Sequence, residues 1–172
     1  YCRTFSRAFG QVIMNRIGFG FDAHRLVSGR KLVLGGVAID YDMGLEGHSD
    51  GDVLTHAIMD GLLGAANLGD KGKLFPSDDP QYKNVGSLIF LGKICDLLAI
   101  ARWKVINIDC TILAQTPMIS PFVTEMKNLI SHALNIYPDN ISIKATTTDH
   151  LGFTGRREGI AAYSVALLEA II

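Results

Sequence analysis

The sequence lacks the features that mark several specialised classes of protein. Its 172 residues include only three cysteines, Cys2, Cys95 and Cys110, which are too few and too scattered for a disulfide framework. No CxxC or HExxH motif occurs, and no apolar run reaches the roughly 18 residues that cross a membrane. We therefore expect a reducing compartment, core thiols at Cys95 and Cys110, and no contact with a membrane.

An excess of charge of either sign is also lacking. Sixteen basic side chains face seventeen acidic ones, for a net charge of −1, and the charged residues form no stripe or long run. Nucleic acids and anionic membrane surfaces select basic patches, so we expect neither as a partner. Hydrophobic residues make up 48% of the chain, enough for a substantial core in one domain.

We expect that domain to span residues 14–172. Residues 1–13 contain Arg3 and Arg7 but no acidic residue, a composition that favours either a transit-peptide remnant or an extension upstream of Met14. The expected location is the bacterial cytoplasm, or the plastid stroma if residues 1–13 are a transit remnant.

Hydrophobic periodicity predicts interleaved strands and helices. Strands are expected at 17–21, 31–34, 37–41, 104–113 and 141–145, and helices at 52–68, 84–100, 121–134 and 158–172. Loops are expected at 25–29, 42–51, 69–82, 114–121 and 146–155, with Asn84 capping the second helix. This order favours helices packed on a sheet.

Histidines and carboxylates cluster near the start of the chain. Asp22 and His24 end a predicted strand and point to the same side, because side chains alternate along a strand. His56 lies on the first predicted helix. Carboxylate and imidazole are ligands of zinc, and three protein ligands leave a position open for chemistry. The alternatives are that His56 lies on a solvated helix face and that neighbouring acids order the helix. Those acids are Asp50, Asp52 and Asp60.

Several longer motifs occur in order along the chain. They are Gly-Phe-Asp-Ala-His (20–24), Leu-Gly-Gly-Val (34–37), Gly-His-Ser-Asp-Gly-Asp-Val (47–53), Ala-Ala-Asn-Leu-Gly-Asp-Lys-Gly-Lys-Leu-Phe-Pro (65–76), Ala-Gln-Thr-Pro (114–117), Lys-Ala-Thr-Thr-Thr-Asp (144–149) and Leu-Gly-Phe-Thr-Gly-Arg (151–156). From Arg16 to the C-terminus, the chain resembles the 2-C-methyl-D-erythritol 2,4-cyclodiphosphate synthase family of the non-mevalonate route to isoprenoids.

The resemblance implies an α+β fold, a two-layer mixed β-sheet with helices packed on one face, and a homotrimer with active sites between subunits. It also implies a reaction. The 2-phosphate of 4-diphosphocytidyl-2-C-methyl-D-erythritol 2-phosphate attacks the β-phosphorus, which closes the ring of 2-C-methyl-D-erythritol 2,4-cyclodiphosphate and releases CMP. A phosphate has a second pKa of about 6, so the nucleophile is already an anion and needs no strong base.

The resemblance assigns roles residue by residue. It implies Zn²⁺ on Asp22, His24 and His56, and a second divalent ion, Mg²⁺ or Mn²⁺, on Asp149. It implies that His48 and Thr147 act in catalysis by stabilising charge on phosphoryl oxygens. The implied substrate contacts are Asp22, His24, His48, Ser49, Asp70, Gly72, Phe75, Pro76, Ser77, Asp78, Asp79, Ala114, Gln115, Thr116, Pro117, Met118, Thr146, Thr147, Thr148, Asp149, Phe153 and Arg156.

Within that set, the resemblance implies that residues 75–79 line the methylerythritol pocket and residues 114–120 bind cytosine. Phe153 and Arg156 are implied to approach a cavity on the threefold axis that takes an isoprenoid diphosphate. Two positions depart from the family pattern: Asp149 stands where glutamate is usual, and Met118 where lysine is usual.

Two other functions remain compatible with the residues alone. A zinc-dependent phosphohydrolase would use the same three ligands to activate water. A non-catalytic module that binds an isoprenoid diphosphate would need no open metal position. Incorporation of oxygen from labelled water separates the hydrolase from the cyclising enzyme.

Overall fold

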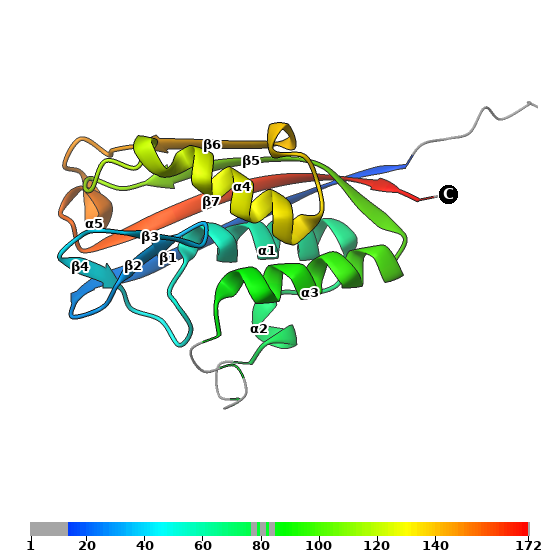
Figure 1. The fold of residues 1–172 in the computed structure, drawn as a ribbon, viewed down its shortest axis with the longest axis horizontal. Helices are drawn as coiled ribbons and strands as arrows, with labels where there is room; N and C mark the ends of the chain where they lie inside the picture. The colour runs from blue at the N-terminus through cyan, green and yellow to red at the C-terminus, as the bar shows by residue number, and fades with distance from the viewer. Residues whose placement is uncertain (1–13, 77–78, 80–81, 83–84, 172) are drawn as a thin grey trace, which may run out of the picture.

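The computed structural model describes residues 14–76, 79, 82 and 85–171, and a five-stranded sheet carries the fold. Three long antiparallel strands form its centre, and a shorter edge strand that pairs in parallel makes it a mixed sheet. In spatial order the strands are β4 (Met43–Leu45), β1 (Asn15–Ser28), β7 (Gly159–Ala170), β5 (Trp103–Leu113) and β6 (Ile141–Thr146). The predicted combination of helices with a mixed sheet is confirmed (Figure 1).

The helices run beside this sheet, together with a short hairpin. They are α1 (Val53–Ala66), α2 (Lys71–Leu74), α3 (Ser87–Ile100), α4 (Val123–Leu134) and α5 (Gly152–Gly155), with 3₁₀ turns at Ser120–Phe122 and Pro138–Asn140. The hairpin pairs β2 (Leu32–Leu34) with β3 (Val37–Ile39), as predicted. In the described part of the chain, no helix is long and apolar enough to cross a bilayer.

The prediction of a helix over 158–172 is wrong, because Gly159–Ala170 forms strand β7. It pairs with β1 on one side and β5 on the other. Alternate residues face opposite sides of the sheet, but both sets are mostly apolar, so hydropathy alone hides the period of two. Alanine and leucine favour a helix in isolation, and pairing with two neighbouring strands overrides that propensity.

The first strand is longer than predicted. It extends from Asn15 to Ser28, so the loop expected at 25–29 is wrong, and Asp22 and His24 lie within the strand. Antiparallel pairing of β4 with residues 26–28 supplies the extra ladder. Three other segments expected as loops contain the short elements β4, α2 and α5. The second predicted helix begins at Ser87, after Gly86 as its N-cap, and Asn84 and residues 1–13 lie outside the described residues.

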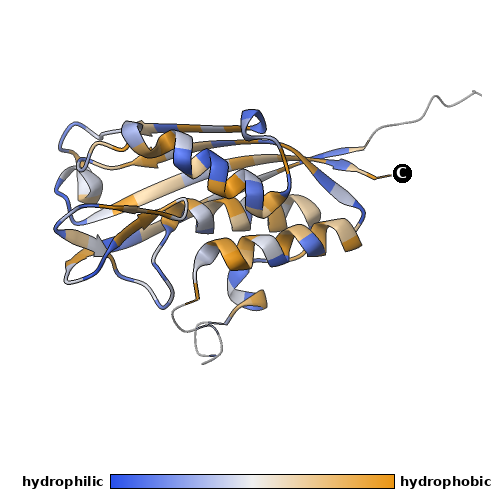
Figure 2. Ribbon diagram, viewed as in Figure 1, coloured by the Kyte–Doolittle hydropathy of each residue, from blue (hydrophilic) through white to orange (hydrophobic). Residues whose placement is uncertain are grey.

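Helix α1 packs unusually close to the sheet. A Cβ atom on Gly18 would lie 1.8 Å from the carbonyl oxygen of Gly61, and one on Gly20 would lie 1.9 Å from that of Ala57. Glycine is therefore required at both positions of β1. The close approach places His56 of α1 beside the strand that carries Asp22. Hydrophobic residues extend along β5 and β7 and over α1 and α3 (Figure 2).

Candidate functional site

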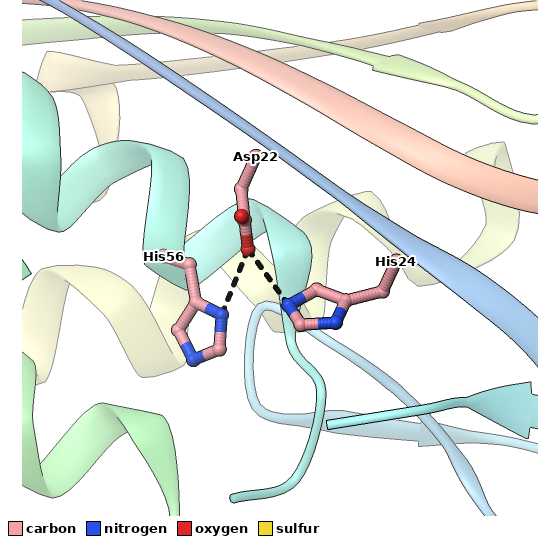
Figure 3. A group of neighbouring side chains, drawn as sticks. All are labelled: Asp22, His24 and His56. Atoms are coloured by element: carbon pink, nitrogen blue, oxygen red, sulfur yellow. Dashed lines mark hydrogen bonds and ion pairs between the residues drawn. The ribbon is translucent and has the colours of Figure 1, made fainter. Parts of the chain in front are cut away.

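Three predicted metal ligands meet between β1 and α1. Asp22 Oδ2 lies 3.0 Å from Nε2 of His24 and 2.9 Å from Nδ1 of His56. Figure 3 shows both imidazoles turned toward the same carboxylate oxygen. Among the described residues, this is the one group of three or more His, Cys, Asp or Glu side chains whose ligand atoms all lie within 4.8 Å of one another. The alternative of a solvated face for His56 is wrong, since it is 7% exposed.

The cluster strongly favours an anionic carboxylate. Burial opposes ionisation of Asp22, but hydrogen bonds with His24 and His56 and the charge of Lys71 outweigh it, which holds the pKa of Asp22 well below its usual range. The hydrogen bond with Asp22 in turn raises the pKa of His24 above 6.5, against the effect of burial. The backbone of Glu46 also hydrogen-bonds to His24. In the metal-free chain, Asp22 therefore favours a proton on His24 more than water would.

A lysine that sequence reasoning did not single out completes the positive side of the site. Lys71 Nζ lies 2.8 Å from Oδ2 of Asp60 and 3.4 Å from Oδ1 of Asp22. Its backbone N–H also donates to Asp60 Oδ1 at 2.9 Å, so Asp60 holds the start of α2 against α1. Lys71 belongs to the Gly-Asp-Lys-Gly-Lys segment, in which a lysine between an aspartate and a glycine was the available signal.

The loop before α1 is anchored at several points. Arg30 donates to the carbonyl oxygens of Gly47 and Ser49, both at 2.8 Å, and so supports the backbone on each side of His48. Asp52 is fully buried and caps α1 by accepting from Thr55 N at 3.0 Å. Asp52 therefore orders the helix, one of the roles expected for it, and it is not part of the metal-ligand cluster.

The cluster opens into a cavity of about 410 Å³. The predicted contacts His48, Ser49, Gly72, Phe75 and Pro76 line it together with the three cluster residues. Four further lining residues were not predicted, namely Met59, Lys71, Tyr82 and Phe90. Phe75 stacks on Phe90 with ring centroids 4.6 Å apart, which gives the cavity an apolar part of its wall.

A second cavity, of about 420 Å³, brings together the predicted nucleotide loop and the end of β6. Its lining includes residues 114–120 with Thr146 and Thr147. The loop is tied down by a hydrogen bond between Thr116 Oγ1 and Tyr41 Oη at 2.8 Å, and its Thr116–Pro117 peptide bond is cis. Met118 is 75% exposed there. Within the described chain, the two cavities share no lining residue.

Several predicted contacts lie outside both cavities. Asp70 caps α2 by accepting from Lys73 N at 2.9 Å, and Thr148 bonds to Leu151 O and Thr154 Oγ1. Asp149 is exposed, and its Oδ1 lies 3.3 Å from Thr147 Oγ1. Phe153 lines a shallow recess beside His24, and Arg156 pairs with Glu158. Asp79 lies outside both cavities, and Ser77 and Asp78 are outside the described residues.

The cluster fits a divalent metal such as zinc. One carboxylate oxygen and two imidazole nitrogens form a donor set that zinc prefers. Donors held roughly 2.0–2.2 Å from an ion at tetrahedral angles lie about 3.3 Å apart, close to the present 2.9 and 3.0 Å. Small movements of the side chains would admit the ion, and the cavity leaves room for a further ligand.

Fold and site together define an α+β protein with a candidate metal centre at the wall of a ligand-sized cavity. The chain belongs to the YgbB family, whose model matches residues 15–169. Two bacterial relatives are named 2-C-methyl-D-erythritol 2,4-cyclodiphosphate synthase. The relative from Pelotomaculum thermopropionicum is 54% identical over 89% of this chain and 94% of its own length. That from Syntrophomonas wolfei is 52% identical over 90% of this chain and 98% of its own length.

Solved structures agree with this assignment. A CDP complex of IspF from Plasmodium falciparum is 34% identical, with a TM-score of 0.81, over 92% of this chain and 97% of its own length. The bifunctional IspDF from Campylobacter jejuni is 42% identical, with a TM-score of 0.89, over 92% of this chain. This chain spans 43% of that bifunctional chain. The family predicted from the motifs is confirmed.

Proposed function

We propose that this chain converts 4-diphosphocytidyl-2-C-methyl-D-erythritol 2-phosphate into 2-C-methyl-D-erythritol 2,4-cyclodiphosphate and CMP. The observation that carries the proposal is the Asp22, His24 and His56 cluster at a cavity, in a chain whose close relatives bear the name of that synthase. One P–O bond forms between the 2-phosphate and the β-phosphorus. The P–O bond to the α-phosphate breaks, and its electrons leave with CMP.

The chain has to bind and orient two anions that repel each other. A divalent metal bound at the cluster supplies a Lewis acid for the phosphoryl oxygens. Lys71 adds a positive charge at the same wall of the cavity. His48 is exposed at the rim, where its ring can donate a hydrogen bond to an oxygen that gains charge. The stacked rings of Phe75 and Phe90 form the apolar side of the cavity.

We assign zinc to the cluster and keep Asp149 as the proposed ligand of Mg²⁺ or Mn²⁺. The donor set of the cluster supports zinc, whereas a lone exposed carboxylate suits a harder ion that also binds phosphate oxygens and water. The test is metal analysis of purified His24→Ala and His56→Ala variants, which should lose zinc. His132→Ala is the matched control, since His132 lies exposed on α4. Zinc retained in both cluster variants at the wild-type ratio would refute the assignment.

We also propose that helices cover one face of the sheet and that a homotrimer closes the other. An uncovered apolar face supports this arrangement. Its exposed side chains are Ile17, Phe19, Phe21, Tyr163 and Val165, at 74%, 62%, 45%, 38% and 42% exposure. Phe19 and Phe21 both contact the ring of Tyr163, so the patch is continuous across β1 and β7. Contiguous apolar surface of this kind is typical of subunit interfaces.

The two separate cavities support active sites shared between subunits. One holds the metal cluster and the other the nucleotide loop, so a neighbouring copy would complete each site. The test is to mix two inactive variants, His56→Ala and Thr147→Ala, by joint refolding. In a shared site some interfaces join two intact halves, and up to about a quarter of wild-type activity should return. No recovery in mixed trimers, or a fully active monomer, would refute the proposal.

Two further predictions accompany this function. Phe153 and Arg156 are proposed to approach an isoprenoid diphosphate on the trimer axis. Arg156 pairs with Glu158 in the single chain, so the diphosphate would have to compete with that carboxylate. The bacterial relatives support a bacterial cytoplasmic location over the plastid stroma.

The direct test of the reaction is to incubate the zinc-loaded chain and Mg²⁺ with the cytidine diphosphate substrate. Phosphorus NMR should show a cyclic diphosphate and CMP in equal amounts. A linear diphosphate product, or no turnover by a chain that holds zinc, would refute the proposed function.

A further inference from the structure

The side of His56 that faces away from Asp22 also makes a hydrogen bond. Its Nε2 lies 2.9 Å from the hydroxyl of Ser87, in a buried contact. Ser87 is the first residue of α3 and has no exposed surface. The Ser87 hydroxyl donates in turn to Oδ1 of Asp50, and the Ser87 backbone N–H donates to Oδ2 of Asp50 at 2.8 Å. Asp50, Ser87 and His56 thus form a chain that ends at the metal cluster.

The direction of each hydrogen bond follows from counting protons. An ionised carboxylate only accepts, so the single proton of the Ser87 hydroxyl is used on Asp50. The Ser87 oxygen must then accept from the Nε2–H of His56. In the neutral imidazole, the other nitrogen, Nδ1, therefore carries the lone pair. In the zinc-loaded chain that lone pair would face the metal beside Asp22, whereas the 2.9 Å hydrogen bond between Nδ1 and Asp22 in the metal-free chain needs a proton on Nδ1.

We propose that Asp50 and Ser87 are positioning residues that select the Nε2–H tautomer of His56 and so make Nδ1 its metal-binding nitrogen. This inference rests on the proposed metal site. The hydrogen-bond acceptor behind a ligating histidine fixes its ring orientation and tautomer, and loss of such a partner commonly weakens metal binding 10- to 100-fold. Neither residue touches the substrate cavity, since neither lines it.

Asp50 also joins three parts of the site. Its Oδ1 accepts from Asp52 N at 3.2 Å, at the start of α1, while both its oxygens hold the start of α3. Helix α3 has no side-chain cap from its own N-cap residue, Gly86, so Asp50 takes that place. A purely structural role is thus the competing explanation: the pair would only fasten α3 to the loop before α1.

The variant Ser87→Ala separates these explanations, because it removes the hydroxyl but keeps the backbone N–H that donates to Asp50. The fastening of α3 should survive, and the link to His56 should be lost. Ser49 Oγ lies 3.4 Å from the same Nε2 and is a weaker substitute at that distance. Ser131→Ala is the matched control: Ser131 is buried, and its hydroxyl bonds only within α4, to Asn128 O at 2.9 Å.

Two measurements on the folded, full-length protein test the proposal. Competition with a chromophoric chelator should show zinc held 10- to 100-fold more weakly by Ser87→Ala and unchanged by Ser131→Ala. Proton–nitrogen NMR of the zinc-loaded wild type should show the His56 ring proton on Nε2, protected from exchange with water. In Ser87→Ala that proton should lose its protection, which a role confined to fastening α3 would not cause.

A second variant covers the case in which Ser87→Ala fails to fold. Asp50→Asn keeps the size of the side chain but replaces one carboxylate oxygen with an NH₂ group, which donates and does not accept. A donor on Ser87 or Asp52 therefore loses its acceptor. The variant should likewise weaken zinc binding and expose the His56 proton. Wild-type zinc affinity with a protected proton in either folded variant, or a proton on Nδ1 in the zinc-loaded wild type, overturns this inference alone. A wild-type chain that binds no zinc would overturn the proposed metal site as well.

Discussion

Gly20→Ala should damage the fold and the metal site together. A Cβ atom at this position would lie 1.9 Å from the carbonyl oxygen of Ala57 and 2.6 Å from the backbone nitrogen of Gly61. Real Cβ contacts essentially never fall below 3.0 Å, so α1 and β1 must separate by on the order of 1 Å. Both obstructing atoms belong to the helix backbone, and no side chain can rotate away to relieve the clash.

The expected loss of stability lies at the upper end for overpacking, about 3 kcal/mol. For a domain of this size it would lower the melting temperature by about 6–12 °C. Because Asp22 lies two residues further along β1 and His56 lies on α1, the same separation pulls the metal ligands apart. Zinc binding should therefore weaken at least about tenfold, even at temperatures where the variant is folded.

The assay is thermal unfolding with and without zinc, beside a chelator titration. Gly64→Ala is the control, since Gly64 lies exposed on the same helix and a Cβ there would meet nothing within 4 Å. That variant should be as stable as the wild type or gain up to about 1 kcal/mol from helix propensity. A Gly20→Ala chain that melts and binds zinc like the wild type would refute the close packing of α1 on β1.

Three further predictions concern charge and metals. Raising the pH through and above 6.5 should strengthen zinc binding, because the raised pKa of His24 makes protons compete with the metal. In the zinc-free chain, His24 contributes its full share of folding stability below pH 6.5, and this share is lost as the pH rises through the pKa of His24 in the folded protein. Met118→Lys should tighten CMP binding by up to about fivefold, as an exposed ion pair is worth roughly 1 kcal/mol or less. Asp149→Ala should lose most activity yet keep its zinc. Asp149→Glu should remain active at a small conformational cost, since Asp149 has a left-handed φ of 48° that aspartate adopts more readily.

Each of these three predictions is contradicted by a specific result. Chelator competition can measure zinc affinity between about pH 5 and 8, the range in which histidine titrates. A zinc affinity that does not change over this range would rule out proton competition at His24. Titration calorimetry that shows no gain for Met118→Lys would mean that the exposed loop position does not face the nucleotide. Near-normal turnover of Asp149→Ala with an unchanged magnesium requirement would remove Asp149 from the metal ligands.

The metal cluster joins residues 34 apart, and it was predictable because all its ligands lie in or beside the motifs that identify the family. Asp22 and His24 stand two apart on a strand, and the motif around His56 places it at the start of a helix. The link from Asp50 to Ser87 was not predictable, because Ser87 belongs to none of these motifs and meets Asp50 only where α3 begins beside the loop. Lys71 joins the site only through the fold, which places the start of α2 against Asp60 and Asp22.

The final strand shows where hydropathy fails. Ala162, Ser164 and Ala166 face α1, while Tyr163 and Val165 lie on the exposed apolar face, so both sides of β7 look hydrophobic. A strand with two apolar faces has no visible period, and its composition suits a helix equally well. The second apolar face is also the one proposed for contact with other subunits, so the missed strand and the subunit interface have a common physical cause.

Turnover in water enriched in oxygen-18 tests the central claim most directly. In the proposed cyclisation the substrate's own phosphate attacks phosphorus, and no oxygen from water enters either product. Mass spectrometry should therefore find unlabelled CMP and unlabelled cyclic diphosphate from the zinc-loaded chain. One labelled oxygen in CMP or in a linear diphosphate would mean that water is the nucleophile, and it would contradict the cyclisation in favour of a metal-dependent phosphohydrolase.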